Sequence, residues 1–305
     1  MPGMFHAAGS VAKHESWFTD GGVRAMPSAM TTSPPVALTI AGSDCSAGAG
    51  LQADLKTFQH FGVHGLTAVT CVVSETANCV RQVHPVPVAI VQDQIALLLA
   101  SFPVAAVKTG MLFSAAHVRA VAEVLAGYPG LAVVVDPVMI ASTGDPLLEP
   151  EAIALYQELL LPLARLITPN LPEAAVLLGT PIPDVAALES AARRLAALYH
   201  TSVLLKGGHL AGSECLDLLL TDGEIFPFTT PRLAVPGSHG TGCTLAAAVT
   251  ARLALGDALP AAVAAAKVYL TETLRSSYAF ESPTGGTVHA LNQGTRWLRS
   301  VTSPA

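Results

Sequence analysis

The chain has 305 residues, of which 51% are hydrophobic and only 12% are charged, and its mean hydropathy is +0.51. No run of about 18 uncharged apolar residues occurs, so the sequence predicts no membrane-spanning helix. The formal net charge is −6 and there is no basic block, which argues against nucleic acid as a partner.

The apolar pattern predicts strands and helices that alternate along the chain. In chain order we expect a strand at 36–41, a helix at 50–61, strands at 67–73 and 105–108, a helix at 114–126 capped by Ser114, and a strand at 131–135. There follow a helix at 150–160, a strand at 166–168, helices at 172–179 and 184–199, the second capped by Asp184, a strand at 202–205, a hairpin at 215–220 and 224–229, and helices at 242–255 and 259–275.

This alternation predicts an α/β fold, with a mostly parallel sheet covered by helices on both faces. We expect one domain over residues 36–290, a disordered N-terminal extension over 1–35 and a C-terminal tail over 291–305. The extension lacks a positive segment followed by an apolar one, so it does not read as a signal peptide. Five cysteines, an odd number, occur without a CxxC pair, which indicates neither a disulfide framework nor a zinc site and favours a reducing cytoplasm.

Polar or glycine-rich segments follow four of the expected strands. The four endings are Gly42-Ser43-Asp44, Asp136-Pro137, Thr168-Pro169-Asn170 and Lys206-Gly207-Gly208-His209. Because ligands bind at the carboxyl ends of parallel strands, these residues are expected to share one edge of the sheet.

The strongest local signal is Ser238-His239-Gly240-Thr241-Gly242-Cys243-Thr244, directly before an apolar helix. Backbone N–H groups at a helix start, freed by two glycines, suit a transferring phosphoryl group. We expect the helix start to lower the pKa of the Cys243 thiol. The alternative is a plain glycine-rich turn with a buried cysteine, and for His239 loop packing is the preferred interpretation.

Asp136 and Glu173 are the candidate magnesium ligands, since Mg²⁺ takes one or two carboxylates together with phosphate oxygens. Glu173 could instead complement the start of its own helix, and Asp136 could cap a turn. Lys206 is a candidate phosphate ligand, or else an exposed lysine at a strand end.

The first loop, residues 41–50, is built of small residues that would let a flat ligand approach the backbone. The chain contains neither a GxxxxGK[ST] nor a GxGxxG segment, which argues against a P-loop protein and against a Rossmann dinucleotide-binding protein. Asp54, placed on the first turn of the helix that follows, could bond a substrate hydroxyl or cap that helix. Met111 is more typical of a core residue than of a ligand.

Eight blocks in a fixed order resemble the hydroxymethylpyrimidine/phosphomethylpyrimidine kinases of the ribokinase-like superfamily. The blocks are ALTIAGSD (37–44), GAGLQADLKTF (48–58), KTGML (108–112), DPVM (136–139), STGDPLL (142–148), TPNLPEA (168–174), KGGH (206–209) and HGTGCT (239–244). The resemblance implies a three-layer α/β/α sandwich, ATP, Mg²⁺, a homodimer, and two successive phosphorylations of 4-amino-5-hydroxymethyl-2-methylpyrimidine in thiamin biosynthesis.

The same resemblance implies a role for individual residues. Magnesium would be held by Asp136 and Glu173, and the hydroxyl would be activated by Cys243. The implied pyrimidine site comprises Gly42, Ala49, Asp54, Glu75, Met111 and Val138. The implied nucleotide site comprises Asn170, Lys206 and Gly208, and the implied anion hole comprises Gly240, Thr241 and Gly242.

The chain departs from the family pattern at two places. Cys45 and Ala47 replace the usual proline and glycine of the first loop, and Glu75 replaces a glutamine. An ionised carboxylate accepts hydrogen bonds only, whereas an amide both donates and accepts. Glu75 therefore makes pyridoxal or pyridoxine kinase activity the main alternative. A non-catalytic ligand sensor and a sugar kinase rank lower, since the chemistry-bearing residues are present and position 243 is not an aspartate.

Overall fold

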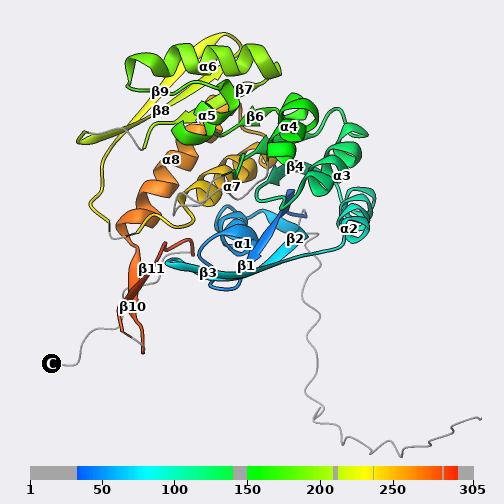
Figure 1. Cartoon of the computed structure of the whole chain (residues 1–305), viewed down its shortest axis with the longest axis horizontal. Helices are drawn as coiled ribbons and strands as arrows, with labels where there is room; N and C mark the ends of the chain where they lie inside the picture. Colours follow the sequence, from blue (N-terminus) through cyan, green and yellow to red (C-terminus); the bar gives the residue numbers. More distant parts are fainter. Residues whose placement is uncertain (1–32, 140–149, 209–211, 236, 284, 295–305) are drawn as a thin grey trace, which may run out of the picture. The chain divides into compact units, whose positions relative to one another are not determined.

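The computed structural model describes residues 33–139, 150–208, 212–235, 237–283 and 285–294. The chain divides into two units, Met1–Ser33 and Pro34–Ala305, and every described residue except Ser33 belongs to the second. Within that unit, nine strands form one sheet in the order β3-β2-β1-β4-β5-β6-β7-β8-β9 (Figure 1). The block at 142–148 lies outside the described residues.

The six inner strands, from β2 to β7, run parallel to one another, and antiparallel strands complete both edges. The strands are β1 (Val36–Asp44), β2 (His64–Thr76), β3 (Cys79–Pro85), β4 (Val104–Thr109), β5 (Ala132–Val135), β6 (Leu166–Ile167), β7 (Ser202–Lys206), β8 (Glu214–Thr221) and β9 (Glu224–Pro231). The predicted mostly parallel α/β sheet is confirmed.

Helices cover both faces of this sheet, as Figure 1 shows. The helices are α1 (Gly50–His60), α2 (Val88–Ser101), α3 (Ala115–Ala126), α4 (Pro150–Leu155), α5 (Leu171–Leu178), α6 (Ala186–Tyr199), α7 (Thr241–Ala254) and α8 (Leu259–Arg275). One buried cluster contains residues of the five helices α2, α3, α4, α5 and α6 together with strand residues such as Val107 and Val135. A second cluster contains residues of α1, α7 and α8 together with Ala106 and Val134. Neighbouring strand residues belong to opposite clusters, as the alternation of side chains in a strand requires.

This alternation places the polar residues at the strand ends. Ala106, Val134 and Leu204 all belong to the cluster under α1, α7 and α8. Lys108, Asp136 and Lys206 lie two positions further along the same strands or directly after them, and therefore point to the same face. An ammonium group, a carboxylate and a second ammonium group thus gather beneath the start of α7.

Several elements depart from the sequence prediction. The pattern did not indicate β3, α2 or the separate hairpin of β10 (Tyr278–Glu281) and β11 (Thr287–Ala290). Apolar residues surround α2, with Ile90 and Leu97 exposed and Val91 and Ile95 buried, so its helical period is blurred. β3 is an edge strand whose residues are mostly exposed, and it lacks alternation.

Both predicted N-caps lie at helix starts, and Asp184, unlike Ser114, accepts a capping hydrogen bond there. The Ser114 hydroxyl makes no capping hydrogen bond and pairs instead with Nδ1 of His117 at 2.7 Å. Asp184 precedes α6 by two residues, and its Oδ1 accepts from Ala187 N at 3.0 Å. The helix predicted at 150–160 is a short α-helix followed by a π-helical turn at Tyr156–Leu160. Among the described helices, none has the length and apolar character needed to cross a membrane.

Candidate active site

Asp136 and Lys206 form a largely buried ion pair at the carboxyl edge of the sheet. The Lys206 Nζ lies 2.9 Å from Oδ1 of Asp136, and the Thr168 hydroxyl donates to the same oxygen at 2.9 Å. Burial disfavours the charged carboxylate, but the ammonium groups of Lys206 and Lys108 outweigh it and hold the pKa of Asp136 below its usual value. The partner of Lys206 is therefore a carboxylate, not solvent as the exposed-lysine interpretation supposed.

The start of α7 lies directly over this pair. A Cβ added at Gly242 would stand 3.5 Å from Oδ2 of Asp136 and 3.5 Å from Nζ of Lys206. Gly240, the N-cap residue, has φ of +83°, a left-handed conformation that favours glycine. The Thr241 amide donates to Ser238 O at 3.2 Å, within the turn itself. The helix start thus brings backbone amides and partial positive charge to the edge where Asp136 and Lys206 meet.

Cys243 follows in the first turn of α7. Burial raises the pKa of its thiol, the charge of Lys108 works against that rise, and Asp54 and Asp136 add to it. The expected lowering of the pKa is therefore wrong for the protein without ligands, because desolvation and two nearby carboxylates outweigh the favourable charges. A thiolate at Cys243 requires an additional positive charge in the site.

Glu173 is 3% exposed at the start of α5 and has two roles there. Its Oε2 accepts from Asn170 N at 2.8 Å, while Asn170 Oδ1 accepts from Glu173 N at 2.9 Å, which makes a capping box. Burial raises its pKa to about 7, Lys206 opposes the rise and Asp136 adds to it. Glu173 therefore does cap the start of its own helix, as the alternative interpretation held. Its ionised form is also disfavoured by burial and by Asp136, and a bound cation would stabilise that form.

These two carboxylates fit a magnesium ion. Within the described ranges, no group of three or more His, Cys, Asp and Glu side chains could hold a metal by itself. Mg²⁺ needs fewer protein ligands, since it keeps several waters and takes one or two carboxylates together with phosphate oxygens. Two acidic side chains buried near one another and beside a lysine match that donor set.

Most of the predicted acceptor residues lie on or beside the first loop. Gly42 and Met111 lie together, since a Cβ at Gly42 would stand 3.8 Å from the Met111 sulfur and 2.9 Å from Sγ of Cys71. Val138, half-buried, follows Asp136 in the next loop. Ala49 lies in the first loop, where its amide donates to Asp44 at 2.8 Å, and the backbone of Glu75 contacts Cys45 of the same loop.

Asp54 neither caps α1 nor lies in its first turn. It is fully buried, with Lys108 Nζ 2.8 Å from both of its oxygens and the Thr39 hydroxyl donating to Oδ2 at 2.6 Å. Burial disfavours the charge on Lys108, but Asp54 outweighs it and raises the pKa of that ammonium group. The sequence reasoning missed Lys108, although it opens one of the eight blocks.

The two glycines after Lys206 differ in their surroundings. A Cβ at Gly207 would stand 2.0 Å from Leu216 O, and the Gly207 amide donates to Oδ1 of Asp217 at 3.0 Å. Gly208 is exposed, and its carbonyl accepts from Arg232 at 2.9 Å. Tight packing therefore explains Gly207, whereas Gly208 lies open at the predicted nucleotide edge.

Fold and site together define a phosphoryl-transferring kinase, with an acid, a lysine and a glycine-rich helix start gathered at the carboxyl edge of a ribokinase-like sheet. A family model described as "Phosphomethylpyrimidine kinase" matches residues 44–288. The chain belongs to this family.

Known relatives agree with this assignment. The chain is 44% identical over 241 residues to the hydroxymethylpyrimidine/phosphomethylpyrimidine kinase of Haemophilus influenzae, covering 78% of this chain and 90% of that protein. It is 45% identical over 238 residues to the thiamine biosynthesis bifunctional protein ThiED of Geobacter sulfurreducens, covering 78% of this chain and 49% of that protein. The chain therefore spans about half the length of the bifunctional relative.

Two solved structures are similar as well. The phosphomethylpyrimidine kinase of Clostridium difficile 630 superimposes with a TM-score of 0.70 at 38% identity, covering 78% of this chain and 98% of that one. The pyridoxal kinase of Bacillus subtilis, in complex with ADP, superimposes with a TM-score of 0.77 at 36% identity, covering 85% and 97%.

Proposed function

We propose that the protein transfers a phosphoryl group from ATP to the hydroxymethyl group of 4-amino-5-hydroxymethyl-2-methylpyrimidine, and then to the resulting monophosphate, as part of thiamin biosynthesis. The observation that carries this proposal is the position of Gly242. A Cβ added there would stand 3.5 Å from both Oδ2 of Asp136 and Nζ of Lys206. A terminal phosphate bound there would meet helix-start amides, a lysine and a cation-binding carboxylate at once, which is what phosphoryl transfer requires.

Asp136 and Glu173 would hold Mg²⁺, which would neutralise phosphate charge and draw the transferring group into line. Asn170 and Lys206 would contact the nucleotide phosphates, with Gly208 at the open nucleotide edge. The Asn170 backbone pairs with Lys206 as an isolated parallel bridge, so these two residues keep a fixed spacing. Gly240, Thr241 and Gly242 would form the anion hole.

Cys243 would accept or orient the proton of the attacking hydroxyl. Burial raises the pKa of its thiol in the protein alone, while Lys108 opposes the rise and Lys206 lies within electrostatic reach. A bound magnesium ion would add positive charge and favour the thiolate. The acceptor ring would rest near Gly42 and Met111, and position 42 has no room for a side chain, since a Cβ there would stand 2.9 Å from Sγ of Cys71.

Glu75 bears on the choice of acceptor. It is half-buried, and burial raises the pKa of its carboxyl, with the Asp44 charge adding to the rise and His239 opposing it. A carboxyl that holds a proton both donates and accepts, like an amide, and would then recognise an aminopyrimidine edge. An ionised Glu75 would instead suit a ring edge that only donates, and the likeness to pyridoxal kinases keeps pyridoxal as the second candidate.

Two further expectations accompany this function. The described cysteines, Cys45, Cys71, Cys79, Cys215 and Cys243, are free, which suits a reaction in a reducing cytoplasm. The homodimer that the resemblance implies stays a prediction, and a measurement of mass in solution would test it.

A substrate panel with Mg-ATP tests the proposal. Hydroxymethylpyrimidine, its monophosphate, pyridoxal and pyridoxine would each be supplied, and ADP release and the phosphorylated product measured. We expect kcat/KM to be highest for the two pyrimidines. Turnover of pyridoxal alone would contradict the proposal in favour of the second candidate, and Glu75→Gln would show whether that residue sets the ratio.

A further inference from the structure

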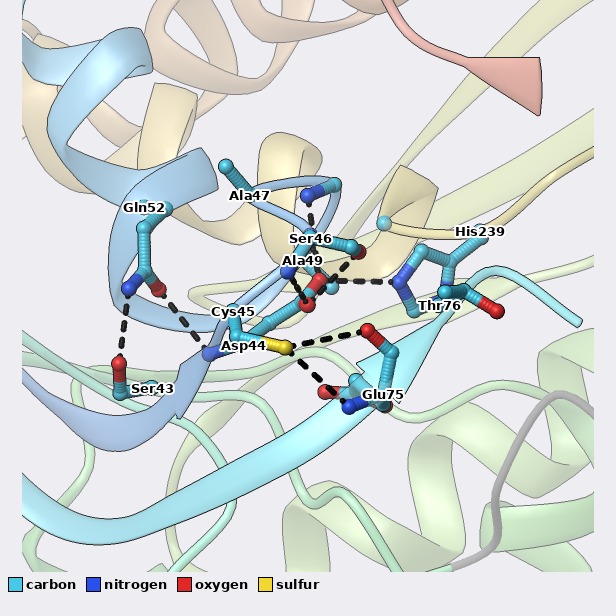
Figure 2. Close-up of polar contacts among 12 residues, drawn as sticks. Ser43, Asp44, Cys45, Ser46, Ala47, Ala49, Gln52, Glu75, Thr76 and His239 are labelled. Atoms are coloured by element: carbon cyan, nitrogen blue, oxygen red, sulfur yellow. Dashed lines mark hydrogen bonds and ion pairs between the residues drawn. The ribbon is translucent and has the colours of Figure 1, made fainter. Parts of the chain in front are cut away.

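Asp44 is the centre of a hydrogen-bond cluster beside the site, drawn in Figure 2. It is 1% exposed, and its Oδ1 accepts from Ser46 N and Ser46 Oγ, both at 2.7 Å. Its Oδ2 accepts from Gly48 N at 3.1 Å, Ala49 N at 2.8 Å and His239 Nε2 at 3.1 Å. Burial opposes its charge, but the bonds from His239 and Ser46 prevail and lower the pKa of Asp44 to about 2.

These bonds hold residues 45–49, in the middle of the first loop, in a conformation that this sequence would not favour by itself. Ala47 has φ of +60°, in the left-handed region that costs an alanine roughly 1–2 kcal/mol. Its own amide donates to Asp44 O at 3.0 Å, and Lys56 Nζ donates to Ala47 O at 2.6 Å. The carboxylate and carbonyl of Asp44 therefore sustain a strained turn next to the acceptor side of the site.

The first loop is in direct contact with the second loop, residues 237–240, which leads into α7. A Cβ at Gly48 would stand 2.8 Å from Cδ2 of His239, and a Cβ at Gly240 would stand 2.0 Å from Gly48 O. Buried Gln293 reinforces the contact, since its Nε2 donates to Gly48 O at 3.0 Å and to Thr244 Oγ1 at 2.9 Å. The two loops therefore have little freedom to move independently where they touch.

The first loop also contacts Glu75 on the other side. The Cys45 thiol lies 3.3 Å from Glu75 O, and the Glu75 amide donates to that sulfur at 3.4 Å (Figure 2). One loop thus touches both the residue expected to read the acceptor ring and the turn that begins the phosphate-binding helix.

Four charged groups surround this contact. The hydrogen bond to Asp44 raises the pKa of His239 above its usual value, burial opposes the rise, and the charges of Asp44 and Glu75 add to it. Lys56 faces Asp44 from α1 and feels its charge. His239 is the histidine of the group, and its contact with Asp44 favours the charged form of its ring.

We propose that Asp44 and His239 form a clasp of positioning residues, which holds the first loop against the start of α7 so that acceptor pocket and phosphate site keep one relative geometry. The proposal rests on the kinase function proposed above and extends it to two residues that do not touch the reacting atoms. Small misplacements of reacting groups cost up to about 100-fold in rate, so such a clasp matters for turnover.

A double-mutant cycle tests the clasp. We expect His239→Ala to lower kcat/KM for the acceptor about tenfold in the wild-type background, mainly through kcat, while the KM for ATP changes less than about twofold. In the Asp44→Ala background the same substitution should change kcat/KM less than about twofold, because its partner is gone. Equal effects in both backgrounds would overturn the proposal. The exposed pair Glu189–Arg193, replaced in the same way, is the matched control.

The pH profile supplies a readout that a merely structural role would not move. Because the hydrogen bond to Asp44 raises the pKa of His239, its imidazole keeps its charge to a higher pH than a free histidine would, and loses it as pH rises through the raised pKa. Wild-type kcat/KM for the acceptor should fall on the alkaline side, whereas His239→Gln, which keeps a donor without a charge, should lack that fall. An identical alkaline fall in His239→Gln would refute the role of the charge.

Hydrogen exchange separates the clasp from the proposed function. The amides of Gly48 and Ala49, which donate to Asp44, should exchange at least about fivefold faster in His239→Ala and His239→Gln than in the wild type, with no substrate present. If the substrate panel fails but this acceleration is seen, the clasp stands and the assigned reaction falls. Unchanged exchange of both amides in folded variants would overturn the clasp itself.

Discussion

The sharpest test of the site is one methyl group added at Gly242. The Cβ of Gly242→Ala would stand 3.5 Å from both Oδ2 of Asp136 and Nζ of Lys206, which is ordinary van der Waals distance. The substitution therefore creates no clash in the free protein. Alanine also favours a helix over glycine by about 0.8–1 kcal/mol in a helix interior, so at this first-turn position we expect stability to be kept or slightly increased.

Catalysis should respond in the opposite way. A phosphate oxygen must approach an amide nitrogen to about 2.9 Å to form a charge-assisted bond, and the added methyl would occupy that space. Loss of one such donor at a developing charge costs about 100- to 1000-fold in kcat. We expect Gly242→Ala to lose activity in that range while its thermal midpoint changes little.

The assay would follow ADP release with the accepted pyrimidine, and differential scanning fluorimetry would follow folding. Gly130→Ala is the matched control, because a Cβ there meets nothing within 4 Å and lies far along the chain from the helix start. A Gly242→Ala enzyme with wild-type kcat and wild-type KM for ATP would refute the placement of the phosphate over the Asp136–Lys206 pair.

Three further outcomes follow from the same geometry. Cys243→Ala should lower kcat by about 100-fold or more and leave the Kd for ADP within about twofold, by calorimetry, and unchanged turnover would rule out the thiol as base. Glu173 has a pKa of about 7, so its carboxyl is partly protonated near neutral pH, whereas Mg²⁺ requires the ionised form. The apparent affinity for Mg²⁺ should therefore rise with pH up to about 7 and level off above it. Glu173→Gln should remove this pH dependence, and a dependence that persists would point to another group. Lys108→Met leaves the Asp54 carboxylate buried without its ammonium partner, so the free energy of unfolding in urea should fall by about 3–5 kcal/mol. A fall below about 1 kcal/mol would show that this ion pair does not stabilise the region.

The sequence determined much of the architecture because local patterns carry it. Apolar alternation and helix periodicity located the inner strands and most helices, including the strand that leads to Asp136 and the apolar helix after Gly240. They could not indicate α2, whose apolar residues surround the helix, or β3, whose exposed residues lack alternation. An edge strand such as β3 forms because it pairs with a neighbouring strand, and its own residues do not show that pairing.

For the site, residue type and position predicted that Asp136, Lys206 and the glycine-rich helix start share one edge of the sheet. Only the tertiary structure decided their partners. Lys206 joins Asp136, Asp54 is fully buried against Lys108, and Asp44 meets His239 across 195 positions of chain. A pKa depends on burial and on charges within a few ångströms, so the thiol of Cys243 could not be assigned from its place at a helix start alone. The periodicity of a chain is local, whereas desolvation and charge pairing arise from segments that meet only when it folds.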